Sequence, residues 1–203
     1  MRRLLPAVLA AAVLVLGACG SADLPKPPGQ AKVDVDTPEL RAIRADAGIE
    51  PCRQAAGAAV DGGLPDVTLP CLGGGPDVDL AGLRGPVVVN LWASWCGPCR
   101  KELPIYQQFH ERYGDRVGVV GIDYNDVQPK AALELARDTG VTYPLLADPG
   151  STLEGTESFP TIPGLPWVVL VDADGKVVHK QAIEITSVDQ LVGLVDEHLG
   201  TDL

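Results

Sequence analysis

Two cysteines separated by two residues, Cys96-Gly97-Pro98-Cys99, lie where an apolar run meets a helical pattern. The run, residues 86–91, is continuous and rich in valine, which is typical of a strand buried on both faces of a sheet. The residues that follow the cysteines, through Tyr113, have the periodicity of a helix. The sequence therefore predicts a strand, a short turn and a helix, with the two thiols at the helix N-terminus.

The position of these thiols favours redox chemistry. Unpaired N–H groups and the positive end of the helix dipole would stabilise a thiolate on Cys96. Cys99 lies one helical turn later and is shielded, so we expect Cys96 to attack and Cys99 to resolve. A zinc site is the alternative, but zinc needs four ligands and the sequence has no second Cys-x-x-Cys or His pair. We therefore expect neither a metal nor an organic cofactor.

Residues 92–99, Trp-Ala-Ser-Trp-Cys-Gly-Pro-Cys, resemble the motif of the thioredoxin superfamily. Pro104 lies where thioredoxins kink the active-site helix, and Pro166 lies where they place a cis-proline before a strand. The resemblance covers residues 65 to 200 and is closest to the extracytoplasmic TlpA/ResA-like branch. It implies an α/β thioredoxin fold, with a central mixed sheet flanked by helices and an N-terminal extension.

The resemblance also implies which residues meet a client protein. A cis bond before Pro166 would present the backbone of Leu165 beside Cys96, free to pair with an extended client segment. The alternative is a trans proline that starts a strand. Trp167, where the family usually has threonine, is expected to fill core rather than line the client groove. The residues expected at the client site are Trp95, Gly97, Pro98, Leu165 and Pro166.

The proton acceptor departs from that of cytosolic thioredoxin. There a buried Asp lies on the strand that enters the motif, whereas this chain has Asn90, whose amide cannot take a proton. In the TlpA/ResA-like pattern a carboxylate lies beside the disulfide, and it falls on Asp126. Asp126 is therefore the candidate proton acceptor, and a solvated loop acid is the alternative.

The N-terminus has the pattern of an export signal. Arg2 and Arg3 precede a short apolar run, and Leu16-Gly17-Ala18-Cys19 matches a lipobox. We expect residues 1–18 to be a signal peptide, Cys19 to be lipidated, 19–36 to be a tether, 37–64 an extension and 65–203 the thioredoxin-like domain. The chain would then lie at the outer face of the cytoplasmic membrane. An uncleaved anchor with an incidental cysteine is the alternative, and a secreted product is the fallback.

Cys52 and Cys71 remain once the other three of the five cysteines are assigned. An exported protein seldom keeps an unpaired thiol, so we expect a structural disulfide that attaches the extension to the first strand, around residues 66–69. The alternative is a second pair that relays electrons to Cys96 and Cys99. Neither cysteine opens a recognisable helix, which disfavours the relay.

The remaining pattern completes one domain. Strands are expected over residues 117–123 and 143–148, a hairpin over 167–183, and helices over 37–47, 129–139 and from Ser187 onward. The three histidines, His110, His179 and His198, share no motif and receive no catalytic role.

Together these patterns predict a membrane-tethered thiol–disulfide oxidoreductase. Its partners would be client proteins with thiols or disulfides and a membrane redox partner. The dipeptide Gly97-Pro98 resembles that of the reducing thioredoxins and favours a reductase, and the resemblance to the TlpA/ResA-like branch implies a role in cytochrome c maturation or a similar process. An oxidase of secreted proteins is the alternative. A non-catalytic binding lipoprotein is the alternative from another class. The formal net charge of −11 disfavours a nucleic-acid partner.

Overall fold

The apolar run before Cys96 forms the middle strand of a five-stranded sheet. In a computed structural model, which describes residues 33–203, β3 (Val87–Trp92) is buried along its whole length. It pairs in parallel with β4 (Gly118–Tyr124) and antiparallel with β6 (Trp167–Val171). The outer strands are β5 (Leu145–Asp148) and β7 (Val177–Gln181), and the order is β5-β4-β3-β6-β7. This is the mixed α/β sheet that the sequence predicts.

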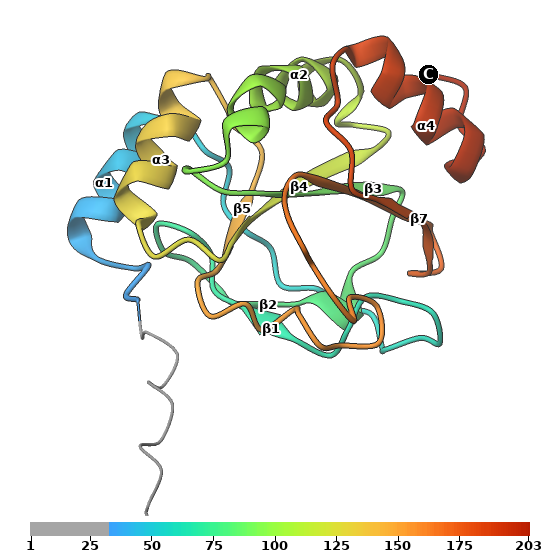
Figure 1. Cartoon of the computed structure of the whole chain (residues 1–203), viewed down its shortest axis with the longest axis horizontal. Coiled ribbons are helices and arrows are strands. Elements are labelled where there is room, and N and C mark those ends of the chain that lie inside the picture. Colours follow the sequence, from blue (N-terminus) through green and yellow to red (C-terminus); the bar gives the residue numbers. More distant parts are fainter. Residues whose placement is uncertain (1–32) are drawn as a thin grey trace, which may run out of the picture.

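Four helices gather on one face of the sheet, drawn above it in Figure 1. They are α1 (Pro38–Asp46), α2 (Gly97–Tyr113), α3 (Pro129–Asp138) and α4 (Val188–Leu199). The crossovers through α2 and α3 both join neighbouring parallel strands in the same direction, which places both helices on one face. Leu103, Tyr106, Phe109, Leu133, Leu191 and Val195 fill the core between helices and sheet.

The opposite face is covered by short elements and loops. Two strands of two residues each, β1 (Thr68–Leu69) and β2 (Val78–Asp79), pair antiparallel in a separate small sheet. A 3₁₀ turn, η1 (Leu80–Gly82), and the loop through Phe159 complete this cover. The sequence predicts the first of these strands but not β2. The first strand is also separate from the central sheet.

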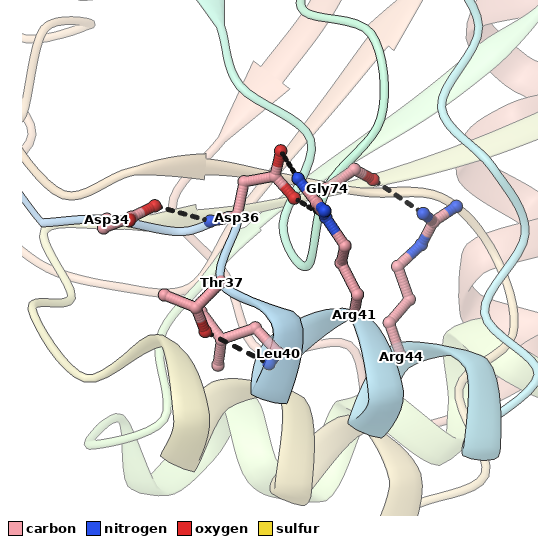
Figure 2. Close-up of polar contacts among 7 residues, drawn as sticks. All are labelled: Asp34, Asp36, Thr37, Leu40, Arg41, Arg44 and Gly74. Atoms are coloured by element: carbon pink, nitrogen blue, oxygen red, sulfur yellow. Dashed lines mark hydrogen bonds and ion pairs between the residues drawn. The ribbon is translucent and has the colours of Figure 1, made fainter.

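The N-terminal segment is docked on the domain. Thr37 caps α1 by accepting the Leu40 N–H, and Arg41 pairs with Asp36 at 2.6 Å. Arg44 donates to the Gly74 carbonyl at 2.6 Å, so α1 contacts the glycine-rich loop that follows Cys71, as Figure 2 shows. A side chain on Gly74 would meet Asp36, which explains the glycine there. The extension therefore belongs to the folded body.

The ordered fold begins slightly before the expected extension. Val35, placed in the expected tether, is buried and its carbonyl accepts the Gly73 N–H at 2.9 Å. The expected signal peptide, the lipidated Cys19 and most of the tether lie outside the described residues. Within residues 33–203, no helix is long and apolar enough to cross a bilayer.

The stretch before β3 also covers both edges of the sheet. On one side, Leu72 N–H donates to Leu145 O, and Ala147 N–H donates to Pro70 O, both at 2.9 Å. On the other side, Val177 N–H donates to Gly62 O at 2.9 Å. Both outer strands thus have neighbours from residues 62–72.

Candidate active site

The two motif cysteines form a disulfide at the N-terminus of α2. Their Cα atoms lie 5.3 Å apart. Cys96 is the N-cap residue, and its Sγ accepts the Cys99 N–H at 3.2 Å. Cys96 is 4% exposed whereas Cys99 is fully buried. An incoming thiol therefore reaches the sulfur of Cys96 before that of Cys99.

The loop between β4 and α3 holds the turn that leads to Cys96. Trp95, whose side chain is 53% exposed, donates from Nε1 to the Asn125 carbonyl at 3.1 Å. Asp126 Oδ2 accepts both the N–H and the hydroxyl of Ser94, at 2.8 and 2.5 Å. Its other oxygen accepts the Gln128 N–H at 2.9 Å. Asp126 is only 2% exposed, so the alternative of a solvated loop acid is wrong.

The cis-proline segment lies on the other side of the motif. The Leu165–Pro166 bond is cis. Pro98 shares with this segment a groove of about 440 Å³. The groove is lined by Pro98, Pro163, Gly164, Leu165, Pro166, Ala182, Ile183 and Glu184. All but one of these residues are uncharged, so the groove suits an apolar segment of a client chain.

Trp167 both fills core and lies at the client groove, two roles that the sequence analysis gives as alternatives. Its ring packs edge-to-face on Phe159, with centroids 6.3 Å apart, in the core on the face opposite the helices. Its Nε1 donates to Gly164 O at 2.8 Å, within the segment that lines the groove. Trp167 thus packs against the core and also fixes the groove wall.

A buried carboxyl group lies on the active-site helix and was missed by the sequence analysis. Glu102 follows Cys99 by three residues and is fully buried, with Oε2 accepting the Ile185 N–H at 3.1 Å. The pKa of Glu102 is raised to about 8, mainly by burial and also by the charge of Glu184, against the lowering effects of the bond from Ile185 and the nearby amide of Asn90. The spacing from Cys99 along the apolar helix face was the signal available in the sequence.

The core around Glu102 contains further polar atoms without partners. Within the described residues, both side-chain polar atoms of Asn90 and the hydroxyls of Tyr106 and Tyr143 are buried and make no hydrogen bond. Burial and the nearby Glu102 raise the pKa of both tyrosines. The tyrosines therefore stay neutral, and Glu102 is the group of this set that titrates near neutral pH.

The other two cysteines are joined in the core on the opposite face of the sheet. Cys52 and Cys71 form a disulfide with Cα atoms 5.9 Å apart, and both are buried. The bond connects the extension to the loop that follows β1. No group of three or more His, Cys, Asp or Glu side chains within residues 33–203 is arranged to hold a metal ion.

The histidines have structural contacts. His110 Nε2 lies 3.1 Å from Glu50, and His179 stacks on His198 with ring centroids 4.1 Å apart. None of these contacts involves the motif cysteines.

A thioredoxin-like sheet with a Cys-Gly-Pro-Cys disulfide at a helix N-terminus, beside a cis-proline, defines the class of thiol–disulfide oxidoreductases. The chain belongs to the Redoxin family, whose profile matches residues 59–192.

Individual relatives agree with this class. The chain is 31% identical over 125 residues to a thiol-disulfide oxidoreductase ResA of Bacillus cereus, an alignment that covers 61% of this chain and 69% of the relative. It is 31% identical over 122 residues to the thiol:disulfide interchange protein CycY of Rhizobium leguminosarum bv. viciae, covering 59% and 62% of the two chains.

Solved structures show the same fold. A DsbF homologue from Corynebacterium diphtheriae superposes with a TM-score of 0.59 at 25% identity, over 74% of this chain and 99% of that one. A secreted thiol-disulfide isomerase from Corynebacterium glutamicum gives 0.56 at 27% identity, over 66% and 85%. The enzyme class and the fold predicted from the sequence are therefore confirmed.

Proposed function

We propose that this oxidoreductase is a reductase of client disulfides, held outside the cytoplasm by a lipid on Cys19. The observation that best supports a reductase is the environment of Cys96. In the described part of the chain, its Sγ accepts a single hydrogen bond, from the Cys99 N–H. The dipeptide between the thiols carries no charge. A thiolate stabilised this modestly leaves the disulfide stable and the dithiol reducing, whereas strong oxidants stabilise the thiolate far more.

The reaction takes two steps. The thiolate of Cys96 attacks one sulfur of a client disulfide, forming a mixed disulfide and releasing the other client sulfur as a thiolate, which takes up a proton. Cys99 then loses its proton and attacks Cys96 Sγ, which releases the second client sulfur and forms the Cys96–Cys99 disulfide. Two electrons pass to the client, and a membrane redox partner that donates two electrons restores the dithiol.

Two carboxyl groups compete as acceptor of the Cys99 proton. Asp126, the candidate from the sequence, already accepts three hydrogen bonds, from Ser94 and Gln128, so both of its oxygens are engaged away from Cys99. Glu102 lies one helical turn after Cys99, and its pKa of about 8 suits proton transfer near neutral pH. This comparison favours Glu102 as a second candidate, and the role of Asp126 stays a prediction.

The client is proposed to lie across the motif as an extended segment. Trp95, Gly97 and Pro98 surround Cys96, and the backbone of Leu165 lies beside Pro166 at the groove. The apolar lining favours clients with apolar residues next to their cysteine. The resemblance to TlpA/ResA-like proteins supports apocytochrome c or a copper-site protein as client.

The direction of electron flow is tested by the equilibrium potential against glutathione. A reductase should have a potential near about −270 mV, whereas a value near about −120 mV, with ready oxidation of a reduced client, would assign the oxidase instead. In parallel, Cys99→Ser should accumulate a mixed disulfide with a client peptide, and Cys96→Ser should not. Loss of reductase activity in both variants with the cellular function of the protein intact would point to a binding protein that does not use these thiols.

A further inference from the structure

Asp123 is a buried acid to which no hydrogen-bond donor is directed. It is the penultimate residue of β4 and 1% exposed, and neither oxygen of its carboxyl group accepts a bond within the described residues. Its neighbours across the sheet are Trp92 on β3 and Ala147 on β5, and neither carries a charge. An ionised carboxylate in such a place would lose its hydration without compensation.

The acid that faces it is Asp126. After burial, the charge of Asp126 is the largest cause that raises the pKa of Asp123, and a hydrogen bond between the two side chains adds to it. Two carboxylates present only acceptors to one another, so a bond between them requires a proton. Asp126 accepts three donors, from Ser94 and Gln128, and these stabilise its negative charge.

We propose that Asp123 and Asp126 share one proton, carried by Asp123, and that Asp123 is a positioning residue for the turn that presents Cys96. The inference deepens the proposed function, because it assigns to this pair a role in thiol exchange. Burial, and then the charge of Asp126, raise the pKa of Asp123 and keep it protonated.

The pair acts on the cysteine through Ser94. The protonated Asp123 donates to Asp126, and Asp126 accepts two bonds from Ser94, which lies two residues before Cys96. Cys96 N–H in turn donates to Ala93 O at 3.1 Å, so Ser94 lies inside a tight turn that ends at the cysteine. When rising pH removes the shared proton, the two carboxylates repel each other and the hydrogen bonds from Ser94 to Asp126 weaken.

Carbon-13 NMR of the whole protein, labelled only at aspartate carboxyl carbons, tests the shared proton directly. Glu102 gives no signal, because this label is absent from glutamate. We expect one aspartate carboxyl to titrate at a pH well above the ordinary range of an aspartate. That signal should vanish in Asp123→Asn and persist in Asp148→Asn, a control at an equally buried acid on the neighbouring strand. Titration of every aspartate in the acidic range, or survival of the signal in Asp123→Asn, would overturn the proposal.

The positioning role is tested by the Ser94 amide and by exchange rates. In the native protein the Ser94 N–H resonance should shift over the same pH range as the Asp123 carboxyl. In Asp123→Asn, whose amide donates without titrating, it should stay constant. The rate of disulfide exchange, relative to Asp123→Asn at each pH, should fall several-fold as the pair ionises. Asp123→Leu, which cannot donate, should be slowed at every pH.

An unchanged Ser94 resonance, or a rate ratio independent of pH, would show that the pair does not position the turn. The NMR measurements need no client. They therefore still decide the shared proton if the protein proves to have no reductase activity, which would contradict only the proposed function.

Discussion

Glu102 introduces a titratable group into an apolar core. Its pKa in the fold is about 8, against 4.5 for the ordinary side chain, so the folded state binds this proton more tightly than the unfolded state. The resulting stability is complete below about pH 4.5 and is lost as the pH rises through about 8. Glu102→Gln, which cannot ionise, should therefore gain stability relative to the native chain as the pH rises over that range.

Urea unfolding midpoints at a series of pH values would measure this gain. Glu157→Gln is a suitable control, because Glu157 is an exposed acid with no role at the thiols. Parallel curves for Glu102→Gln and the native chain would show that the buried carboxyl contributes nothing to the pH dependence.

The proton acceptor of Cys99 can be identified by comparing two variants. If Asp126 accepts the proton, Asp126→Asn should slow turnover and shift the pH–rate profile while the fold stays intact. If Glu102 is the acceptor, Glu102→Gln should remove the step in the profile near its own pKa, and Asp126→Asn should lower the rate without moving the profile. Stopped-flow tryptophan fluorescence during reduction of the disulfide supplies these rates.

At the scale of single residues, the sequence predicts the chemistry of the two motif thiols better than that of the buried acidic side chains. The helix periodicity alone places Glu102 on the same buried face as Cys99, so this residue was within reach of the sequence analysis. The burial of Asp126 depends instead on Ser94, which lies 32 residues away in the chain. No local pattern of charge or hydrophobicity reports a contact of that kind.

Helices and the long strands are predictable because their signals are local. Ser187 accepts the Gln190 N–H as a helix cap, and Thr37 does the same for Leu40, at the two positions that the sequence indicates. The strand β2 has only two residues and pairs with another equally short strand. A strand that short has no periodicity, and its pairing partner across the loop decides its existence.

The Cys52–Cys71 disulfide is expected to stabilise the N-terminal elements without taking part in exchange. The double variant Cys52→Ser, Cys71→Ser should lose about 3 kcal/mol of stability, since the bond closes a loop of moderate length. Its rate of exchange at Cys96 should stay unchanged. In the native chain the bond should survive mild dithiothreitol that reduces the motif. Peptide mapping that joins Cys52 to Cys96 or Cys99 would contradict this assignment.

At the scale of the whole molecule, the expected location in the cell depends on the N-terminal lipidation motif. If Cys19 is lipidated, the native chain should partition with membranes and be released by detergent, whereas Cys19→Ala should not be retained in that way. Fractionation of cells that produce each form measures the difference. Equal retention of the two forms would refute the lipid anchor.

Residues 62–72 contact both outer strands of the sheet, and this affects how the molecule behaves at high protein concentration. An open strand edge offers N–H and C=O groups to any other chain, which is a common route to aggregation. Here Gly62 bonds to the first residue of β7, and Pro70 and Leu72 bond to β5, so a single short stretch contacts both outer strands. A chain shortened to begin after Leu72 should therefore keep its thiols and yet associate as its concentration rises, which light scattering would detect.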